Sequence, residues 1–221
     1  GLVRSLMLLL SDPVVTHVAV AFDHVIESFR NKMYAGYKSS EGVDPIILNQ
    51  FPVAEKLVSA LGLVVWPMVK FEADDAIATA VAKFKKVKSV EQIVICSVDK
   101  DLTQMVEGDR VICWDRRREI FLDENGVVEK FGVGPESIPD YLALVGDSAD
   151  GYPGVPPPLP PCLRNSNTSS LFPKTQQNWA WDLDALRPWL KTYNRIIKMP
   201  CCLENCPRCA LTFRSKRISL T

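Results

Sequence analysis

Eight acidic residues stand at the ends of apolar stretches of the chain, where carboxylates can do chemistry. One follows a strand-like stretch, three begin a helix-like stretch, two follow another strand-like stretch, and two lie in a glycine-rich loop. They are Asp23, Glu72, Asp74, Asp75, Asp99, Asp101, Asp147 and Asp150. Ligands of open parallel sheets bind beyond the carboxyl ends of the strands. We therefore expect these carboxylates to converge there.

Converging carboxylates repel one another unless cations neutralise them. Oxygen ligands without accompanying His or Cys favour Mg²⁺ or Mn²⁺ over zinc. Two such ions about 4 Å apart suit the in-line hydrolysis of a phosphodiester, because they activate water and neutralise charge on the phosphate. Each residue alone also fits a turn or a helix N-terminus, as does the single motif Asp99-Lys100-Asp101. The set as a whole favours a metal cluster.

Apolar periodicity predicts the elements that would position these carboxylates. Helices are expected over Leu2–Leu10, Pro45–Leu63, Ala73–Phe84 and Ile138–Val145. Strands are expected over Val14–Phe22 and Ile93–Val98, with a strand pair over Val111–Trp114 and Glu119–Leu122. Strands that alternate with helices are typical of βαβ units. The sequence therefore predicts an α/β fold with a mostly parallel sheet.

Composition excludes several classes of protein and divides the chain in two. The 221 residues, 47% of them hydrophobic and 24% charged, are typical of a globular protein, and the apolar runs are far shorter than a membrane span needs. Residues 1–156 carry 23 acidic and 16 basic residues, whereas residues 157–221 carry 3 and 10. Five of the seven cysteines lie in that basic tail. The odd total of seven does not favour a secreted disulfide framework.

Five stretches of the chain resemble the 5′-to-3′ exonuclease/flap endonuclease family, in the bacterial form found at the N-terminus of DNA polymerase I and as separate proteins. They are FDHVIESFRNKMYAGYK (22–38), NQFPVAEKLVSALGL (49–63), FEADDAIATAVAKF (71–84), CSVDKDLTQMV (96–106) and DYLALVGDSADGYPGVP (140–156). The resemblance covers residues 1–156 and implies a three-layer, PIN-like nuclease domain. It further implies hydrolysis of DNA at 5′ ends or 5′ flaps, in replication and repair, with two Mg²⁺ or Mn²⁺ ions.

The resemblance also implies a role for each site residue. The resemblance places Asp23, Glu72, Asp74 and Asp75 around the first metal and its bridge to the second. Around the second metal it places Asp99, Asp101, Asp147 and Asp150. Arg30 and Lys38 fall at basic, catalytic positions near the scissile phosphate, and Lys100 is expected to contact DNA. Tyr34 and Tyr37 fit two roles equally well, stacking on an unpaired base or packing against the sheet.

The chain departs from the family pattern in three places. The family's first strand, with an early metal-binding Asp, is absent ahead of Leu2–Leu10, and the chain begins at Gly1, so we expect a fragment or processed product. The basic residue of the family's YKxxR motif is replaced by Glu41. After Pro156 the family's Gly-x-Gly-x-Lys segment, which grips duplex DNA, is missing.

These departures lead us to treat residues 157–221 as a separate, poorly ordered and non-homologous tail. Its CCLENCPRC segment (201–209) has enough thiolates for zinc, although its spacing fits no standard finger. We expect a monomer that binds DNA, does not enter membranes and, if bacterial, works in the cytoplasm near the nucleoid. The alternatives are a relic that binds DNA or metal without cutting, and a fragment that folds poorly because its sheet lacks a central strand.

Overall fold

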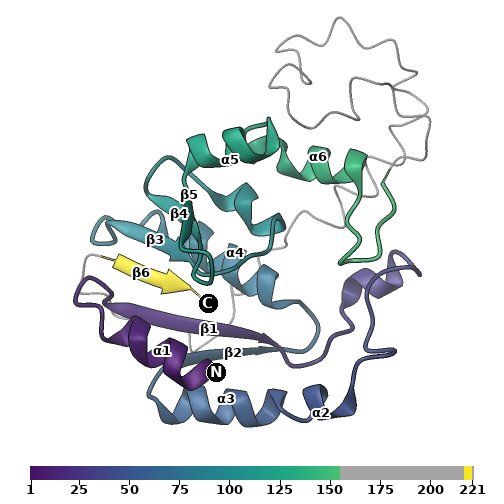
Figure 1. Cartoon of the computed structure of the whole chain (residues 1–221), viewed down its shortest axis with the longest axis horizontal. Helices are drawn as coiled ribbons and strands as arrows, with labels where there is room; N and C mark the ends of the chain where they lie inside the picture. The colour runs from purple at the N-terminus through teal and green to yellow at the C-terminus, as the bar shows by residue number, and fades with distance from the viewer. Residues whose placement is uncertain (155–216, 221) are drawn as a thin grey trace, which may run out of the picture.

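A six-stranded sheet forms the centre of the molecule in the computed structural model, which describes residues 1–154 and, as backbone, residues 217–220 (Figure 1). Its strand order is β2-β1-β6-β3-β4-β5. The strands are β1 (His17–Asp23), β2 (Val64–Met68), β3 (Gln92–Ile95), β4 (Val111–Asp115), β5 (Ile120–Leu122) and β6 (Arg217–Leu220). All neighbours pair in parallel except β5, which runs antiparallel to β4. The carboxyl ends of β1, β2 and β3 therefore meet at one edge.

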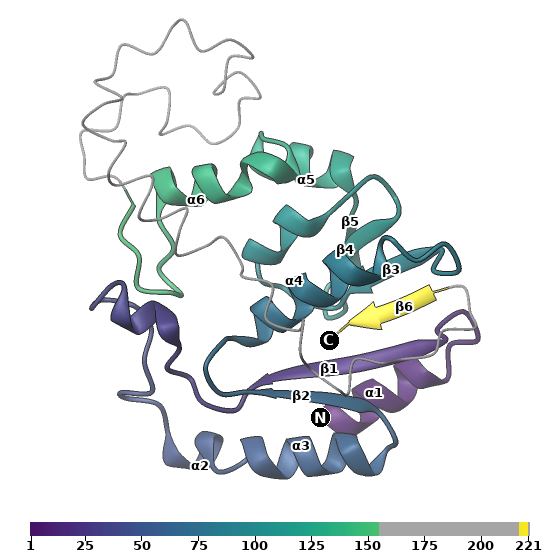
Figure 2. The same ribbon diagram turned by 180° about the vertical axis from the view of Figure 1, so that it is seen from behind.

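Helices cover both faces of this sheet and complete three layers (Figure 2). On one face, α1 (Leu2–Leu10) and α3 (Phe51–Ala60) pack against Val18 and Val20 of β1. Ala19 points to the other face, which α4 (Ala73–Phe84), α5 (Glu124–Phe131) and α6 (Ile138–Val145) cover. Shorter helices are α2 (Pro45–Leu48) and the 3₁₀ turns η1 (Phe29–Lys32), η2 (Asp101–Met105) and η3 (Pro135–Ser137). The α/β fold is the one that the sequence predicts.

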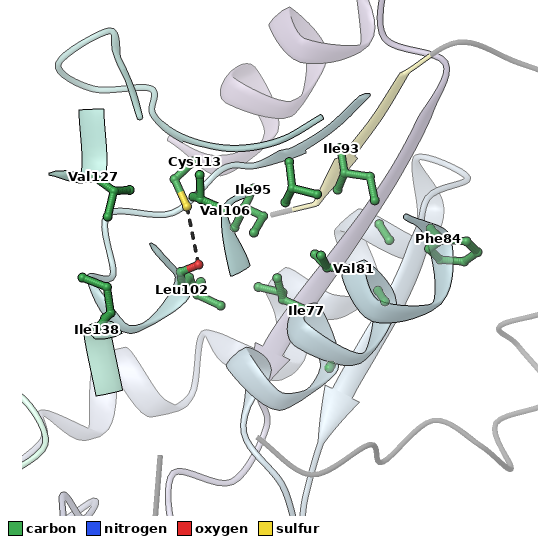
Figure 3. Close-up of a cluster of buried hydrophobic side chains, with 14 of the residues drawn as sticks. Ile77, Val81, Phe84, Ile93, Ile95, Leu102, Val106, Cys113, Val127 and Ile138 are labelled. Atoms are coloured by element: carbon green, nitrogen blue, oxygen red, sulfur yellow. Dashed lines mark hydrogen bonds between the residues drawn. The ribbon is translucent and has the colours of Figure 1, made fainter. Parts of the chain in front are cut away.

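The larger apolar core fixes the helix that carries the acidic motif (Figure 3). Ile77, Val81 and Phe84 of α4 are buried against Ile93 and Ile95 of β3. On the η2 side of the same core, the buried Cys113 thiol donates a hydrogen bond of 3.7 Å to the Leu102 carbonyl. Because α4 and η2 share one core, their first residues are held at the same edge of the sheet.

Most of the expected elements form, but one expected helix was wrong and two elements were not expected. The single helix over Pro45–Leu63 is two helices, α2 and α3, which are interrupted at Asn49 and Gln50. Pro52 lies in the first turn of α3, where its missing N–H costs nothing, and it cannot continue a preceding helix. The edge strand β2 and helix α5 were not expected; Pro67 within β2 is tolerated at a sheet edge but masks the strand pattern.

The tail beyond residue 156 enters the sheet through its last few residues. Arg217–Leu220 forms β6 between β1 and β3, so the backbone edges of these two strands are paired and not open. The other expectations for this region, including those for CCLENCPRC (201–209), concern residues outside those that the structure describes. Within the described part of the chain, no helix has both the length and the apolar character needed to cross a membrane.

Candidate active site

The elements bring all of the predicted acidic residues to the carboxyl edge of the sheet. Asp23 is the last residue of β1, and Glu72 precedes the first turn of α4. Asp99 follows β3, and Asp101 begins η2. The loop that follows α6 supplies the remaining pair, Asp147 and Asp150.

Three carboxylates form the tightest group of this edge. Oxygen atoms of Asp101, Asp147 and Asp150 all lie within 4.8 Å of one another. Asp101 and Asp147 are buried, and Oδ1 of Asp101 has no hydrogen-bond partner among the described residues. Burial raises the pKa of Asp101 to about 8, with further contributions from Asp99, Asp150 and Asp147. A buried, unpartnered oxygen beside two other carboxylates is a donor set that fits a hard divalent cation.

Three other carboxylates, Asp23, Asp74 and Asp99, lie near the start of α4. Oδ1 of Asp23 accepts a hydrogen bond of 2.7 Å from the Ala73 N–H, and burial raises the pKa of Asp23. The pKa of Asp74 is raised well above its usual range by burial and then by the charge of Asp99. Oδ1 of Asp99 accepts a hydrogen bond of 3.0 Å from the Asp101 N–H. This bond links the carboxylates near the start of α4 to the group of Asp101, Asp147 and Asp150.

Glu72 and Asp75 share a buried cationic partner, the guanidinium of Arg30. The guanidinium of Arg30 donates two hydrogen bonds of 2.8 Å to Asp75 and one of 3.1 Å to Glu72. The Glu72 N–H also donates to Asp75, which closes a capping box at the start of α4. Arg30 is only 3% exposed, so its guanidinium lies inside the protein. The structure thus brings Arg30 to the acidic residues, as a partner of Asp75.

Lys38 and Tyr37 connect Glu72 with the loop after α6. The Lys38 ammonium lies 2.8 Å from Glu72 Oε2 and 3.2 Å from Asp150 Oδ1. The Tyr37 hydroxyl donates to the same Glu72 oxygen at 3.0 Å and lies 3.3 Å from Asp150 Oδ2. Burial raises the pKa of Glu72, but the charges of Lys38 and Arg30 outweigh burial and hold it below its usual range. Glu72 is therefore a charged anchor for these cations.

The remaining predicted residues lie at the margin of the site. Lys100 forms an ion pair with Asp147, at 3.0 Å, and its side chain is 36% exposed. Tyr34 packs edge-on against Tyr152, with ring centroids 5.7 Å apart, and contacts the larger core. Tyr37 is 7% exposed. In this conformation the Tyr37 ring is buried, whereas Tyr34 is only partly buried, so stacking on a base stays a prediction.

Sequence reasoning missed Ser28 and the part that glycine plays in the 146–154 loop. The Ser28 hydroxyl donates to Glu72 Oε1 at 2.5 Å while its oxygen caps η1, a role indicated by its place two residues before Arg30. Gly151 has φ of +75°, and a Cβ there would lie 2.2 Å from the Gly36 carbonyl oxygen. This close approach lets the Lys38 N–H donate to the Asp150 carbonyl at 3.0 Å.

Comparison with known sequences points to one family. Residues 1–132 match the family described as the 5′-3′ exonuclease, N-terminal resolvase-like domain. A 5′-3′ exonuclease of Aquifex aeolicus is 36% identical over 157 residues, which make up 70% of this chain and 53% of the relative. The DNA polymerase I of Mycobacterium leprae is 34% identical over 160 residues, or 71% of this chain and 17% of that protein. The chain thus spans about half of the first relative and a small part of the second.

Solved structures share the fold at lower sequence identity. Bacteriophage T5 5′-exonuclease with bound zinc has a TM-score of 0.69 and 18% identity, over 90% of this chain and 80% of that one. A bacteriophage T5 flap endonuclease variant in a complex with DNA and metal ions has a TM-score of 0.60 and 19% identity, over 89% and 78%. These likenesses establish the fold, which is that of the three-layer nuclease expected from the sequence.

Proposed function

Because the chain belongs to the family of the 5′-3′ exonuclease N-terminal domain, we propose that it hydrolyses DNA phosphodiesters at 5′ ends or 5′ flaps. The observation that carries the proposal is the group of Asp101, Asp147 and Asp150, in which a buried Asp101 oxygen has no hydrogen-bond partner among residues 1–154. Such hydrolysis belongs to DNA replication and repair, in keeping with the DNA polymerase I and exonuclease names of the relatives.

The proposed cofactors are two Mg²⁺ or Mn²⁺ ions held by different parts of the carboxylate edge. Asp101, Asp147 and Asp150 would hold one ion, and Asp23, Asp74 and Asp99 would hold or share the other. Divalent ions bound there would activate water and neutralise phosphate charge. The raised pKa values of Asp74 and Asp101 support this proposal, because buried carboxylates without a counter-cation retain their protons.

In this proposal Glu72 and Asp75 are less direct participants than the other six acidic residues. The buried guanidinium of Arg30 binds both of them and Ser28 also binds Glu72, so they would orient the start of α4, and with it Asp74. Lys38 and Lys100 are the partly exposed cations at this edge, and their ammonium groups would bind backbone phosphates of DNA. The DNA partner is supported by the DNA complex of the similar T5 flap endonuclease variant.

A cleavage assay on a 5′-labelled flap and on a nicked duplex, with Mg²⁺ or Mn²⁺, tests the proposal. Asp101→Asn should lower the rate by about 10²-fold or more, because it removes one charge from the tightest carboxylate group. Asp109→Asn is the matched control, since Asp109 is an exposed aspartate in the turn before β4. Product that forms equally fast with both variants would contradict the proposal.

The second candidate function is metal binding without catalysis, by a chain that descends from the nuclease family but does not cut DNA. Lys38 and Lys100 favour it, because they already form ion pairs with Glu72, Asp150 and Asp147 and partly neutralise the site. Calorimetric titration with Mn²⁺ separates the two candidates. If Asp101→Asn weakens Mn²⁺ binding and the folded protein does not cleave DNA, the result favours metal binding without catalysis. Binding together with cleavage supports the nuclease.

A further inference from the structure

The central sheet contains a strand from the far end of the chain. β6, residues 217–220, lies between β1 and β3 and runs parallel to both (Figures 1 and 2). Ile218, Ser219 and Leu220 stand opposite residues 17–19 of β1, and residues 217–220 stand opposite residues 92–95 of β3. More than 90 residues of sequence separate β5 from this strand, and yet it pairs on both sides.

The two strands beside β6 are among the most buried parts of the sheet. Residues 18–20 of β1 and residues 93–95 of β3 are all buried. Backbone N–H and C=O groups on their facing edges would lack partners without β6, and water would have little access to them. An interior position with open edges on both sides is a site for one additional strand, and here the C-terminal end of the chain occupies it.

This strand also lies between the two halves of the carboxylate edge. Asp23 ends β1, whereas Asp99 and Asp101 follow β3. Neighbouring strands are about 4.8 Å apart, so the inserted strand holds β1 and β3 roughly 10 Å apart. If β6 left, the sheet would open or β1 would approach β3, and either movement would change the distance between Asp23 and Asp101.

We propose that residues 217–220 act as an inserted strand that completes the sheet and sets the spacing of the carboxylates on β1 and β3. The C-terminal end is thus a positioning element of the site, and the site assembles only when that end is docked. The occupant is this chain's own C-terminal segment. The inference rests on the proposed metal centre only for its second measurement below; the first measurement does not involve metal or DNA.

Hydrogen exchange of the full-length chain, followed by mass spectrometry, is the first measurement. Ser219→Pro removes a backbone donor from the middle of a central strand, a position that proline does not tolerate. Thr221→Pro is the matched control, because it places the same residue just after the strand. We expect protected amides at residues 218–220 in the unaltered chain and in the control. In Ser219→Pro, exchange at residues 18–20 and 93–95 should accelerate about tenfold or more.

The second measurement is the affinity for Mn²⁺ of the same three proteins, together with their melting temperatures. Ser219→Pro should lower the melting temperature by about 10 °C and the affinity about tenfold or more, whereas Thr221→Pro should change neither. Amides of 217–220 that exchange at the rate of an unfolded peptide would overturn the inference, as would a second copy of the chain found to supply the strand. Unchanged Mn²⁺ affinity in a Ser219→Pro protein that has lost protection of β1 and β3 would overturn the positioning role. The proposed nuclease function would stand or fall separately, on the cleavage assay.

Discussion

One buried oxygen of Asp101 has no hydrogen-bond partner in the part of the chain that the structure describes. Burial and the neighbouring carboxylates also raise the pKa of Asp101 to about 8. The ordinary pKa of the group is 3.8. Because the folded-state pKa is higher than this, the stability that the protonated group contributes is full below about pH 4 and is lost as the pH rises toward 8. A divalent cation has to displace that proton, so its binding strengthens over the same range.

We therefore predict that Mn²⁺ raises the melting temperature more at about pH 8.5 than at about pH 6. Thermal unfolding with and without Mn²⁺ at both pH values measures the effect. The Asp101→Asn variant has no proton to displace at this position, so its response should be weak at both pH values. An equal response of the unaltered protein at both pH values would show that Asp101 does not control binding.

Arg30 is a buried cation whose partners are also buried. Its ion pair with Asp75 has side-chain exposures of 4% and 0%, and its guanidinium lies over the Phe29 ring at 4.7 Å. Removal of one partner from a buried pair leaves the other charge uncompensated, which costs about 3–5 kcal/mol. Arg30 therefore stabilises the start of α4 by holding Asp75 and Glu72.

We predict that Arg30→Gln lowers the free energy of unfolding by about 3–5 kcal/mol, as measured by urea denaturation. Arg118→Gln is the control, because Arg118 is 75% exposed and its pair with Asp115 is long, at 3.7 Å. The control should change stability by less than about 0.5 kcal/mol. If Arg30→Gln kept normal stability and lost only DNA cleavage, the catalytic role expected from the sequence would be the better description.

Among the elements, the 146–154 loop needs glycine at position 151, where its backbone lies against that of Gly36. Asp147 and Tyr152 exchange backbone hydrogen bonds of 2.8 and 2.6 Å across the loop, which carries Asp147 and Asp150 to the site. Gly151 touches the Gly36 carbonyl, so any side chain there pushes the loop away from the segment of Tyr37 and Lys38. The close approach of Gly151 to Gly36 thus helps to position both acidic residues.

We predict that Gly151→Ala lowers the affinity for Mn²⁺ about tenfold or more, because the loop shifts its carboxylates. Gly62→Ala is a matched control: Gly62 has a similar φ of +80°, but a Cβ there would have no atom of the described residues within 4 Å. Both variants should lose about 1–2 kcal/mol of stability from the positive φ. Only Gly151→Ala should lose affinity in a calorimetric titration, and equal losses in both would contradict the contact argument.

In the whole molecule, the proposed metal centre takes its ligands from several separate elements. Carboxylates reach it from β1, the start of α4, η2 and the loop after α6. A ligand that binds only the folded state stabilises it by about 2.7 kcal/mol when its concentration is 100 times its dissociation constant. Divalent cations should therefore stabilise the entire fold and not only one loop.

We predict that saturating Mn²⁺ or Mg²⁺ raises the melting temperature by about 5–10 °C and that a chelator reverses the change. Differential scanning calorimetry measures this in the full-length chain. Sodium chloride at the same ionic strength is the control for general screening of the acidic edge. If the sodium salt produced the whole shift, a specific divalent site would be ruled out.

Local patterns were sufficient to predict much of the fold and the place of the acidic residues. Helices over Leu2–Leu10 and Ala73–Phe84, and the strand pair of β4 and β5, follow from periodicity within short stretches. Parallel strands then bring the residues that follow them to one edge, which is why Asp101 could be expected near the other carboxylates. The break between α2 and α3 and the edge strand β2 were missed because local signals, Pro52 and Pro67, competed with periodicity.

Spacing along the chain was enough to predict the α/β class and the convergence of the carboxylates. The tertiary structure was needed to show which oxygens of the described residues lack a partner, since the pairing of Arg30 with Asp75 joins residues 45 positions apart. It also decided that the C-terminal residues 217–220 complete the centre of the sheet. Strand pairing between distant segments depends on backbone hydrogen bonds that leave little trace in side-chain pattern, so a four-residue strand at the end of the chain could not be assigned a partner in advance.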